Sequence, residues 1–530
     1  MKRKPNILWI SFEDTNPFYG CYGDKIARTP NIDRFAKQGC LFTHCFSTSG
    51  VCAPARSAII TGMYPSSIGT HHMRTSHQDS RTPELPTPYS AVIPHYVKCF
   101  TEYLRAEGYY CTNNSKTDYQ FDPPFTAWDE CGPNAHWRNR KKKEQPFFAV
   151  FNLMKTHESG MWHENCPEIT FDPEKIELPP YFPDTKKVRE AMARMYTNIE
   201  INDTLFGEIL KELEKDNLAE NTVVFHWSDH GPLPRGKRWL YDTGIHVPLI
   251  MKWPGFIKPG TKNTRLISTI DLGPTVLSVA GIPVPAYMQG RPFLGKYATE
   301  PRKFIFASRD RIDESYDMSR AVRDKRYKYI RNYYPNTFYS IWVDYLNKHP
   351  IMEELWSLYC ENKLKGNELL LFKKKDTEEL YDTVNDPWET NNLAGDPAYK
   401  KQLNKMRTAL DEWMKKINDM GRIQETELVK FWYGGEQPKT ATPLFIPINS
   451  ENPGVKAICE DMVFRARGPL LVQIYCATQG ASIGYRINDG DWQIYTEPVK
   501  IEKGKTQVTA KTVRIGYRES EVRKIIFDLT

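Results

Sequence analysis

Two short apolar runs, far apart in the chain, each end in a pair of side chains able to bind a metal. The run NILWISF is followed at once by Glu13 and Asp14, and the run TVVFHWS by Asp229 and His230. Continuous apolar runs of this length are typical of strands buried on both faces of an α/β sheet. Such folds bind ligands outside the carboxyl ends of their strands. The two pairs together therefore predict an α/β domain with a site at these strand ends, whereas one acidic pair alone would favour a solvated turn.

A second motif lies between these runs. Residues 51–62 read VCAPARSAIITG, in which Cys52, Pro54 and Arg56 fit the pattern C-x-P-x-R. Proline suits the first turn of a helix, because its missing N–H costs nothing there. Cys52 is then expected near a helix N-terminus, where an anion is favoured, with Arg56 one helical turn further on. The alternative is a buried cysteine that opens an ordinary helix, since free cysteine behaves as a small hydrophobe.

In this order, the motifs resemble those of the type I, formylglycine-dependent sulfatases of the alkaline-phosphatase-like superfamily. The likeness covers residues 5–420, and Tyr181–Gly255 is most similar to the sulfamidase branch, which includes heparan N-sulfatase. The resemblance implies that a separate maturase oxidises Cys52 to Cα-formylglycine, so that the active protein carries a different residue there. It further implies that the hydrated aldehyde attacks sulfur and that its second hydroxyl allows sulfate to leave.

The resemblance also implies a divalent metal. Its expected ligands are residues of the three motifs: Glu13, Asp14, Cys52, Asp229 and His230. The family has Ca²⁺ here, usually with an Asp pair at the first two positions. The longer Glu13 either coordinates differently or supports the other ligands. Because a histidine ligand is softer than oxygen, Mg²⁺ and Mn²⁺ remain alternatives.

Catalytic roles follow from the same resemblance. Lys116, which ends the stretch GYYCTNNSK, and Lys237, within GKRWLY, are expected to bind the sulfate oxygens. His157, which follows the apolar run FFAVFNL, is expected to protonate the leaving group. Arg56 is expected to hold the nucleophile and the metal ligands rather than the substrate.

One position departs from the family. A histidine usually stands two residues after the first lysine, where this chain has Asp118. Asp118 either serves as the base or orients another group, such as His71 or His72. Those histidines belong to the sequence THHMR shortly after the cysteine motif, which either lines a substrate pocket or is a loop with incidental histidines. The expected substrate-binding set unites basic and aromatic residues: His71, His72, Arg74, Trp137, Arg138 and His163.

The length of 530 residues exceeds what one hydrophobic core supports. We expect a catalytic α/β domain with helices on both faces of a central mixed sheet over residues 5–300. A smaller α+β subdomain is expected over residues 301–425. Short strands between turns over residues 430–530 predict a β-sandwich, similar to the module at the C-terminus of hexosaminidase-type enzymes. That module is expected to serve packing, with sugar binding as the alternative.

Composition excludes some classes of function. The net charge of +7 is small for a dedicated nucleic-acid binder, and no apolar run reaches the ~18 residues of a membrane span. The basic run RNRKKK either steers a polyanion or is a solvated loop. Eleven cysteines without tight spacing predict few or no disulfides. Because the family is commonly exported, a periplasmic or secreted enzyme whose leader has been replaced by a start methionine is preferred, and a cytosolic enzyme is the alternative.

The predicted function is a sulfatase acting on sulfated carbohydrates such as glycosaminoglycans or algal polysaccharides, on O-sulfate or on N-sulfate. Its expected partners are that substrate and, transiently, the maturase, with no nucleic acid. One alternative is a phosphonate or phosphate ester hydrolase, because sulfuryl and phosphoryl groups differ mainly in charge. Another is a glycan-binding protein built on a catalytically inactive sulfatase scaffold.

Overall fold

The computed structural model describes residues 4–75, 88–335, 337–451, 454 and 456–530. These residues form two compact units. The first contains residues 4–74 and 150–422, and the second contains residues 75, 88–149 and 423–530. The second unit is therefore built from an internal segment together with the C-terminal segment.

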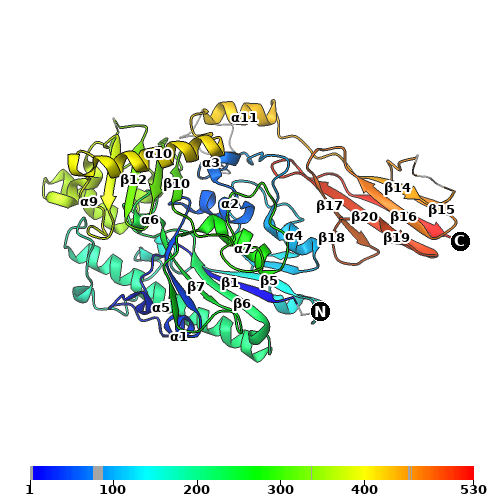
Figure 1. Ribbon diagram of the computed structural model, residues 1–530, viewed down its shortest axis with the longest axis horizontal. Coiled ribbons are helices and arrows are strands. Elements are labelled where there is room, and N and C mark those ends of the chain that lie inside the picture. The colour runs from blue at the N-terminus through cyan, green and yellow to red at the C-terminus, as the bar shows by residue number, and fades with distance from the viewer. Residues whose placement is uncertain (1–3, 76–87, 336, 452–453, 455) are drawn as a thin grey trace. The chain divides into compact units, whose positions relative to one another are not determined.

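The centre of the first unit is a mixed β-sheet (Figure 1). Its strands are β1 (Asn6–Phe12), β2 (Cys40–Phe46), β5 (Phe147–Leu153), β6 (Thr222–Ser228), β7 (His246–Lys252), β8 (Thr261–Asn263) and β9 (Ile267–Ser268). They lie in the order β5-β1-β6-β7-β2-β8, and β9 pairs with β2. β1 and β6 are parallel, whereas β7 is antiparallel to β6. Every residue of β1 and β6 is buried, as their continuous apolar sequences predict.

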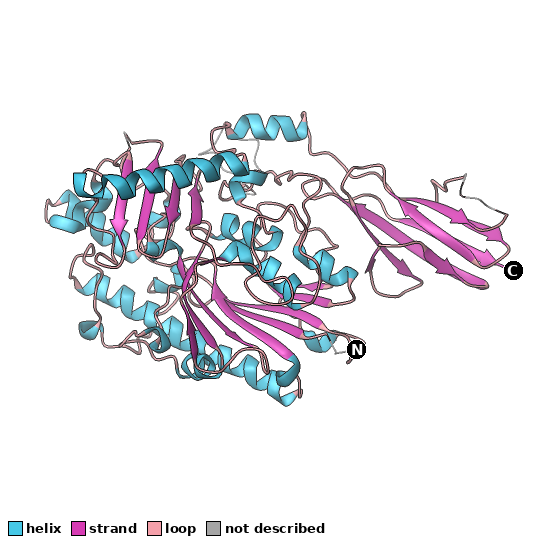
Figure 2. Cartoon of the chain, in the orientation of Figure 1, coloured by secondary structure: helices cyan, strands magenta, loops and turns pink. Residues whose placement is uncertain are grey.

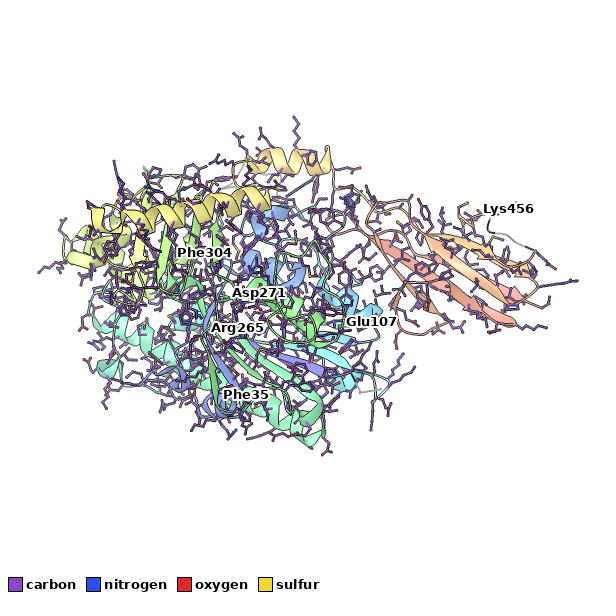
Figure 3. All side chains as sticks on the ribbon, in the orientation of Figure 1. Phe35, Glu107, Arg265, Asp271, Phe304 and Lys456 are labelled. Carbon is purple, nitrogen blue, oxygen red and sulfur yellow. The ribbon has the colours of Figure 1, made fainter. Side chains whose placement is uncertain are left out.

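Helices cover both faces of this sheet (Figure 1). On one face, α1 (Pro30–Gln38) packs on α5 (Lys186–Lys215), where the rings of Phe35 and Phe206 meet edge-on with centroids 5.3 Å apart. Phe35 is labelled in Figure 3. On the other, α2 (Cys52–Thr61) contacts α7 (Leu272–Val279), and all residues of α2 are buried. The shorter helices of this unit are α3 (Pro65–Ile68), α6 (Asp242–Ile245), α8 (Asp344–Asn347) and α9 (Pro350–Cys360).

A smaller antiparallel sheet completes the first unit. Its strands, in spatial order, are β10 (Ile305–Arg309), β11 (Ser319–Arg323), β12 (Tyr327–Asn332) and β13 (Glu378–Asp382). The helix α10 (Lys400–Ile417) packs on β11 and β12. Leu403, Met406, Leu410 and Trp413 recur at the spacing of one helix face and join the sheet in one apolar cluster.

The second unit contains a β-sandwich (Figure 2). Its strands are β14 (Leu444–Ile448), β15 (Met462–Ala466), β16 (Leu470–Tyr475), β17 (Ser482–Ile487), β18 (Gln493–Ile494), β19 (Val499–Ile501), β20 (Gly504–Val513) and β21 (Arg523–Leu529). One sheet has the order β14-β16-β19 and the other β15-β21-β20-β17-β18. Residues of β16 alternate between buried and exposed, and both sheets contribute to one apolar cluster. The internal segment adds α4 (Phe100–Ala106), β3 (Tyr110–Asn114) and β4 (Glu130–Cys131), and α11 (Glu425–Tyr433) precedes the sandwich.

The predicted fold class is confirmed: a mixed α/β sheet, a smaller α+β sheet and C-terminal β-sheets are all present. Ile201 of α5 is 37% exposed although it is apolar. The buried face there carries Asn202 and Asp203 instead. The Asp203 carboxylate accepts hydrogen bonds from the backbone N–H groups of Asn31 and Ile32, which begin α1, so polar capping displaces the apolar pattern.

All eleven cysteines are free thiols. Among the described residues, no helix combines the length and the apolar character that crossing a membrane requires.

Candidate active site

The parallel pairing of β1 with β6 brings the two acidic motifs together. Phe12 and Ser228 are partners in the register at the carboxyl ends of these strands. The next residues of each strand therefore leave the sheet side by side, and the N–H of Asp14 donates to Asp229 Oδ1 at 3.2 Å. Asp14 adopts a left-handed backbone conformation (φ 44°), which turns the chain sharply after the strand.

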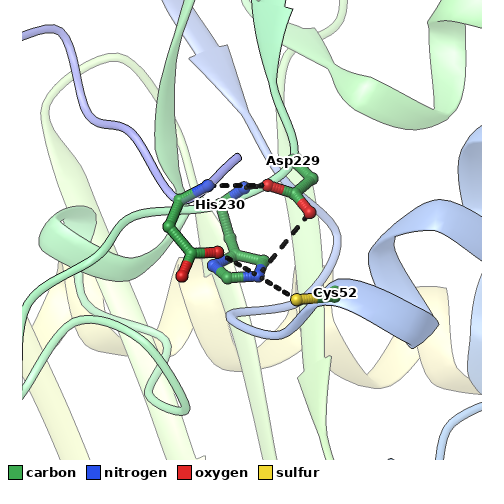
Figure 4. Close-up of side chains that lie close together, drawn as sticks. Cys52, Asp229 and His230 are labelled. Carbon is green, nitrogen blue, oxygen red and sulfur yellow. Dashed lines mark hydrogen bonds and ion pairs between the residues drawn. The ribbon is translucent and has the colours of Figure 1, made fainter. Parts of the chain in front are cut away.

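Cys52 is the first residue of α2, after Val51, whose backbone is extended. Its Sγ lies 3.1 Å from His230 Nε2, and the same ring nitrogen lies 3.7 Å from Asp229 Oδ2 (Figure 4). The thiol is fully buried, as are Asp229 and His230. A helix N-terminus, an imidazole and carboxylates thus meet at one sulfur atom.

The donor set formed by Asp14, Cys52, Asp229 and His230 fits a divalent cation. One ligand atom from each lies within 4.8 Å of all the others. Asp14 Oδ1 is buried, accepts no hydrogen bond from the described residues and lies 3.3 Å from His230 Nε2, so one cation can contact both atoms. Burial, followed by the nearby charge of Glu13, raises the pKa of Asp229 to about 7, so a cation beside this carboxylate would favour its charged form. Oxygen-rich sites of this kind suit Ca²⁺, and the imidazole also suits Mn²⁺.

Arg56 ties the ligands to one another. Its Nη2 lies 3.1 Å from Glu13 Oε1, its Nε 3.1 Å from Asp229 Oδ2, and its Nη1 donates to Asn152 Oδ1 at 3.0 Å. The guanidinium is buried, where such bonds to charged groups are strong. Glu13 therefore contacts Arg56, and through it Asp229.

Lys237 lies at the centre of a second group of donors. Its Nζ is 2.6 Å from Asp14 Oδ2, 3.0 Å from Glu158 Oε1 and 3.4 Å from His157 Nε2. These acceptors, taken alone, would also suit a cation, but the ammonium group occupies that position. Burial lowers the pKa of Lys237, yet the charges of Asp14 and Glu158 outweigh burial and raise it, so the side chain stays charged.

The loop that carries Lys237 is tightly constrained. Arg235 and Arg238 both have positive φ angles, 64° and 78°, which non-glycine residues adopt only where surrounding contacts hold them. The N–H of Arg238 donates to Gly50 O at 2.7 Å, two residues before Cys52. A Cβ on Gly50 would lie 2.3 Å from Trp239 O, so only glycine permits this approach.

His157 follows β5 and faces Lys237. Its Nδ1 lies 2.9 Å from Ser159 Oγ, and its Nε2 lies 3.9 Å from Asp14 Oδ2. Burial and the charge of Lys237 lower the pKa of His157 to about 4, so the ring is neutral near pH 7.

Sequence reasoning missed three residues of this cluster: Glu158, Arg238 and Tyr345. Glu158 is buried, binds Arg238 through both carboxylate oxygens at 2.6 and 2.8 Å, and donates its backbone N–H to Asp14 Oδ2 at 2.8 Å. The ring of Tyr345, from α8, lies 6.2 Å from that of His157 and 5.0 Å from that of Trp162. The acid beside His157 and the cation beside Lys237 were visible in the sequence, but only the fold pairs them.

The other expected substrate-binding residues of the first unit are His71, His72, Arg74 and His163. His71 and His72 are buried with ring centroids 4.2 Å apart. They follow Thr70, whose Oγ1 accepts a hydrogen bond from Ser57 Oγ of α2 at 2.7 Å. Arg74 forms an ion pair with Asp313 at 3.9 Å. His163 is exposed.

Four expected site residues belong to the second unit. Lys116 Nζ and Asp118 Oδ2 lie 3.7 Å apart, and Asp118 has a positive φ of 55°. Trp137 is fully buried and stacks on Phe147 with centroids 5.7 Å apart, and the guanidinium of Arg138 lies 5.8 Å from its ring.

Comparison with family models matches two parts of the chain. Residues 5–132 and 133–282 match the model described as sulfatase, and residues 229–368 match that described as N-sulphoglucosamine sulphohydrolase, C-terminal. The matched segments include the strand ends, the cysteine helix and the Lys237 loop.

Individual relatives agree with these matches. An ulvan-active sulfatase of Formosa agariphila is 41% identical over 99% of this chain and 92% of its own length. Human N-sulphoglucosamine sulphohydrolase is 26% identical over 79% of this chain and 91% of its own.

Among solved structures, a 2-O glycosaminoglycan sulfatase superposes with a TM-score of 0.56 at 21% identity, over 79% of this chain and 93% of that one. A phosphonate monoester hydrolase of Agrobacterium radiobacter gives 0.56 at 16% identity, over 79% and 97%. At these identities the two structures establish a shared fold only.

Proposed function

The chain belongs to the sulfatase family, and from that premise we propose that it removes sulfate groups from a sulfated polysaccharide. The family resemblance seen in the sequence is thereby confirmed, as is the class of sulfuric ester hydrolases. The observation that carries the proposal is the meeting of Cys52 with Asp14, Asp229 and His230 in one buried cluster. Fold alone does not fix chemistry, so the argument rests on this cluster.

We propose that Asp14, Cys52, Asp229 and His230 hold the divalent cation, with Ca²⁺ preferred and Mg²⁺ or Mn²⁺ as alternatives. Glu13 supports them through Arg56, which contacts both Glu13 and Asp229. When present, the aldehyde derived from Cys52 supplies the nucleophile, and the cation favours its ionisation.

Lys237 is proposed to bind a sulfate oxygen. Its ammonium group is buried and fixed by two carboxylates, and a fixed cation in a low-dielectric site stabilises developing negative charge strongly. Lys116 is proposed for the same role. Asp118, which pairs with it, is proposed either as the base or as a group that orients one.

His157 is proposed to protonate the leaving group. The ring is neutral while Lys237 faces it. A bound sulfate would place negative charge beside both groups and raise the pKa of His157, so that the ring takes up a proton as substrate binds. Substrate binding would thus protonate His157, which then donates that proton to the leaving group.

The substrate is proposed to be a polymer of the ulvan type carrying O-sulfate, because the ulvan-active relative shares more identity over more of the chain than the N-sulphoglucosamine sulphohydrolase. A polysaccharide is too large and too polar to cross a membrane unaided, so the enzyme is proposed to act outside the cytoplasm. His71, His72, Arg74, Trp137, Arg138 and His163 stay candidates for contacts with the sugar.

The test begins with residue 52. Protein made together with a formylglycine-generating maturase is digested, and the peptide that contains Cys52 is weighed. Conversion of the thiol to the aldehyde lowers the mass by about 18 Da, a covalent change that decides the nucleophile. The same preparation is then incubated with ulvan oligosaccharides, and released sulfate is measured by ion chromatography, with Cys52→Ala as the control.

Sulfate release that requires the converted residue is the expected result. A strong preference for an aryl phosphonate over the sulfated substrates would favour a phosphonate hydrolase. Unconverted Cys52 without any activity would favour a binding scaffold.

A further inference from the structure

The second unit contains a large hollow of about 1270 Å³. One wall comes from the internal segment between α4 and β5, and the other from β17, β18 and β20 of the β-sandwich. Residues 485–511 on that second wall lie beyond residue 368, where the matched family models end. The proposed sulfatase reaction uses none of the lining residues.

The floor of the hollow is firmly built. Arg105, only 4% exposed in its side chain, pairs with Asp129 Oδ1 at 2.8 Å. It also donates to the carbonyl oxygens of Phe125 at 3.2 Å and Trp492 at 3.1 Å, so one guanidinium joins the two walls. A Cβ on Gly484 would lie 2.4 Å from the Phe125 ring, so glycine allows the walls to approach. The hollow therefore has a fixed shape before any ligand enters.

Aromatic side chains line the hollow. The rings of Phe125 and Trp492 meet at 70° with centroids 5.6 Å apart, and Trp492 is partly exposed. Lys511 Nζ lies 4.0 Å from the Phe125 centroid, and the Arg486 guanidinium 5.2 Å from that of Trp492. An exposed indole offers a broad apolar face, which suits the C–H face of a sugar ring.

Cations available to an anion stand beside these rings. Within the described residues, neither Lys142 nor Arg486 forms an ion pair, and Arg486 Nε makes no hydrogen bond. A guanidinium binds an oxyanion through two parallel N–H groups. Carboxylates line the hollow as well: Asp129 and Asp491 pair with Arg105 and Lys141, and Glu130, Glu144, Asp489 and Glu497 can accept hydrogen bonds from hydroxyl groups. Aromatic faces, free cations and acceptors together match a ligand with sugar rings, sulfates and hydroxyls.

We propose that this hollow is a non-catalytic binding site for a sulfated saccharide segment. The choice of ligand rests on the proposed function, because it assigns the hollow the same class of polymer. Trp492 packs on a sugar ring, and Arg486 and Lys142 bind sulfate groups. The site retains the polymer on the enzyme and raises the local concentration of sulfated segments.

The experiment measures binding of full-length protein carrying Cys52→Ala, so that no turnover is needed. Its probes are ulvan oligosaccharides and the same oligosaccharides after chemical desulfation, titrated by calorimetry. Trp492→Ala and Arg486→Ala test the hollow. The matched controls are Tyr475→Ala, an aromatic that is 50% exposed on β16, and Arg467→Ala, whose side chain is 81% exposed; neither lines the hollow. Melting temperatures identify any variant that fails to fold. If Trp492→Ala fails to fold, Arg486→Ala still tests the hollow, because its side chain forms no ion pair among the described residues.

Each hollow variant is expected to weaken binding of the sulfated probe about tenfold or more, as loss of a central aromatic or arginine contact typically does. Both controls should bind like the parent, and desulfation should weaken the parent more than it weakens Arg486→Ala. Equal binding by all folded variants would overturn the proposal, as would equal binding of sulfated and desulfated probes. Sulfate release by the matured enzyme is scored separately, so an inactive enzyme that binds as expected refutes the proposed function and leaves the binding site standing.

Discussion

Charged side chains of this protein occur in two contrasting settings. In the first unit, the side chains of Asp14, Glu158 and Lys237 are at most 4% exposed. Glu158 and Lys237 each contact two other charged groups, and Asp14 contacts Lys237. On the hollow of the second unit, Lys141 and Asp491 form an isolated ion pair whose side chains are both 68% exposed. Removing one partner of a buried pair leaves an uncompensated charge, which is costly. Water replaces the partner of an exposed charge, so the loss there is small.

Buried and exposed charged residues therefore differ in what they contribute. The buried network fixes the position of each atom around Cys52, as preorganised catalysis requires. The exposed charges stay hydrated and adaptable, which suits a polymer whose sulfates vary in position. Four substitutions or conditions, from the largest expected effect to the smallest, sharpen or break this comparison.

The largest effect is expected at Cys52, where the buried cluster meets. Cys52→Ala removes the side chain from which the nucleophile derives, so sulfate release should fall at least about ten-thousandfold. Initial rates of sulfate release by ion chromatography check this. The melting temperature should stay close to that of the parent, because alanine fills nearly the same buried space. Residual activity within a hundredfold of the parent would show that another group attacks sulfur.

Glu158→Gln should reduce both activity and stability. The substitution leaves the buried cation Arg238 without its counter-charge and removes one of the two carboxylates that contact Lys237, the other being Asp14. Breaking a buried pair costs about 3 kcal/mol or more. Because Glu158 positions Lys237 rather than touching substrate, kcat should fall about a hundredfold with little change in KM. Urea unfolding and steady-state kinetics check the two effects.

The matched control for Glu158 is Glu353→Gln, which loses an ion pair to Lys187 whose side chains are 50% and 43% exposed. It should leave both measurements unchanged. Equal effects at the two glutamates would contradict the distinction between buried and exposed charge.

How much of this network the sequence predicts depends on how local each signal is. A strand followed by two acids, or a proline two residues after a cysteine, is readable within ten residues, and Asp14, Cys52 and Asp229 do meet. Glu158 was missed because its partner, Arg238, lies 80 residues away, and only the fold brings them together. The role of Asp203 on the buried face of α5 is hidden from the sequence for the same reason, since its partners Asn31 and Ile32 lie on α1.

The hollow in the second unit shows more clearly what local sequence patterns cannot predict. Phe125 and Trp492 meet although more than 360 residues separate them, and no periodicity or motif links the two segments. Strand patterns predicted the β-sandwich, because the alternation of apolar and polar residues is a local signal. They gave no indication that the internal segment between α4 and β5 forms the other wall of the hollow.

Acidification should destabilise the first unit through a buried histidine. His226 is fully buried, with Nδ1 2.9 Å from Ile10 O and Nε2 3.1 Å from the Tyr19 hydroxyl. A carbonyl only accepts, so Nδ1 carries the proton and Nε2 accepts from the tyrosine, which is the neutral ring. Burial lowers the pKa of His226 from 6.5 to about 4.

Between pH 6.5 and 4 the unfolded state therefore binds more protons at this residue than the folded state. Its contribution to stability is complete above pH 6.5 and is lost as the pH falls toward 4, by up to about 3 kcal/mol. Because carboxylates titrate in the same range, the measurement is the difference in unfolding free energy between the parent and His226→Asn at each pH. That difference should shrink as the pH falls, and a constant difference from pH 8 to 4 would contradict the assignment. His163→Asn, at an exposed ring, should show no such trend.

The smallest effect is expected at the exposed pair on the hollow. Lys141 Nζ and Asp491 Oδ1 lie 2.7 Å apart, a distance that in the buried network accompanies strong coupling. Here both side chains are mostly in water, so a double-mutant cycle with Lys141→Ala and Asp491→Ala should give a coupling energy below about 0.5 kcal/mol. Urea unfolding at low and high salt checks this, since any coupling should decline further as salt screens it. A coupling above about 1 kcal/mol that persists in salt would mean that exposure does not set the strength of ion pairs in this protein, and the contrast between its two charged regions would fail.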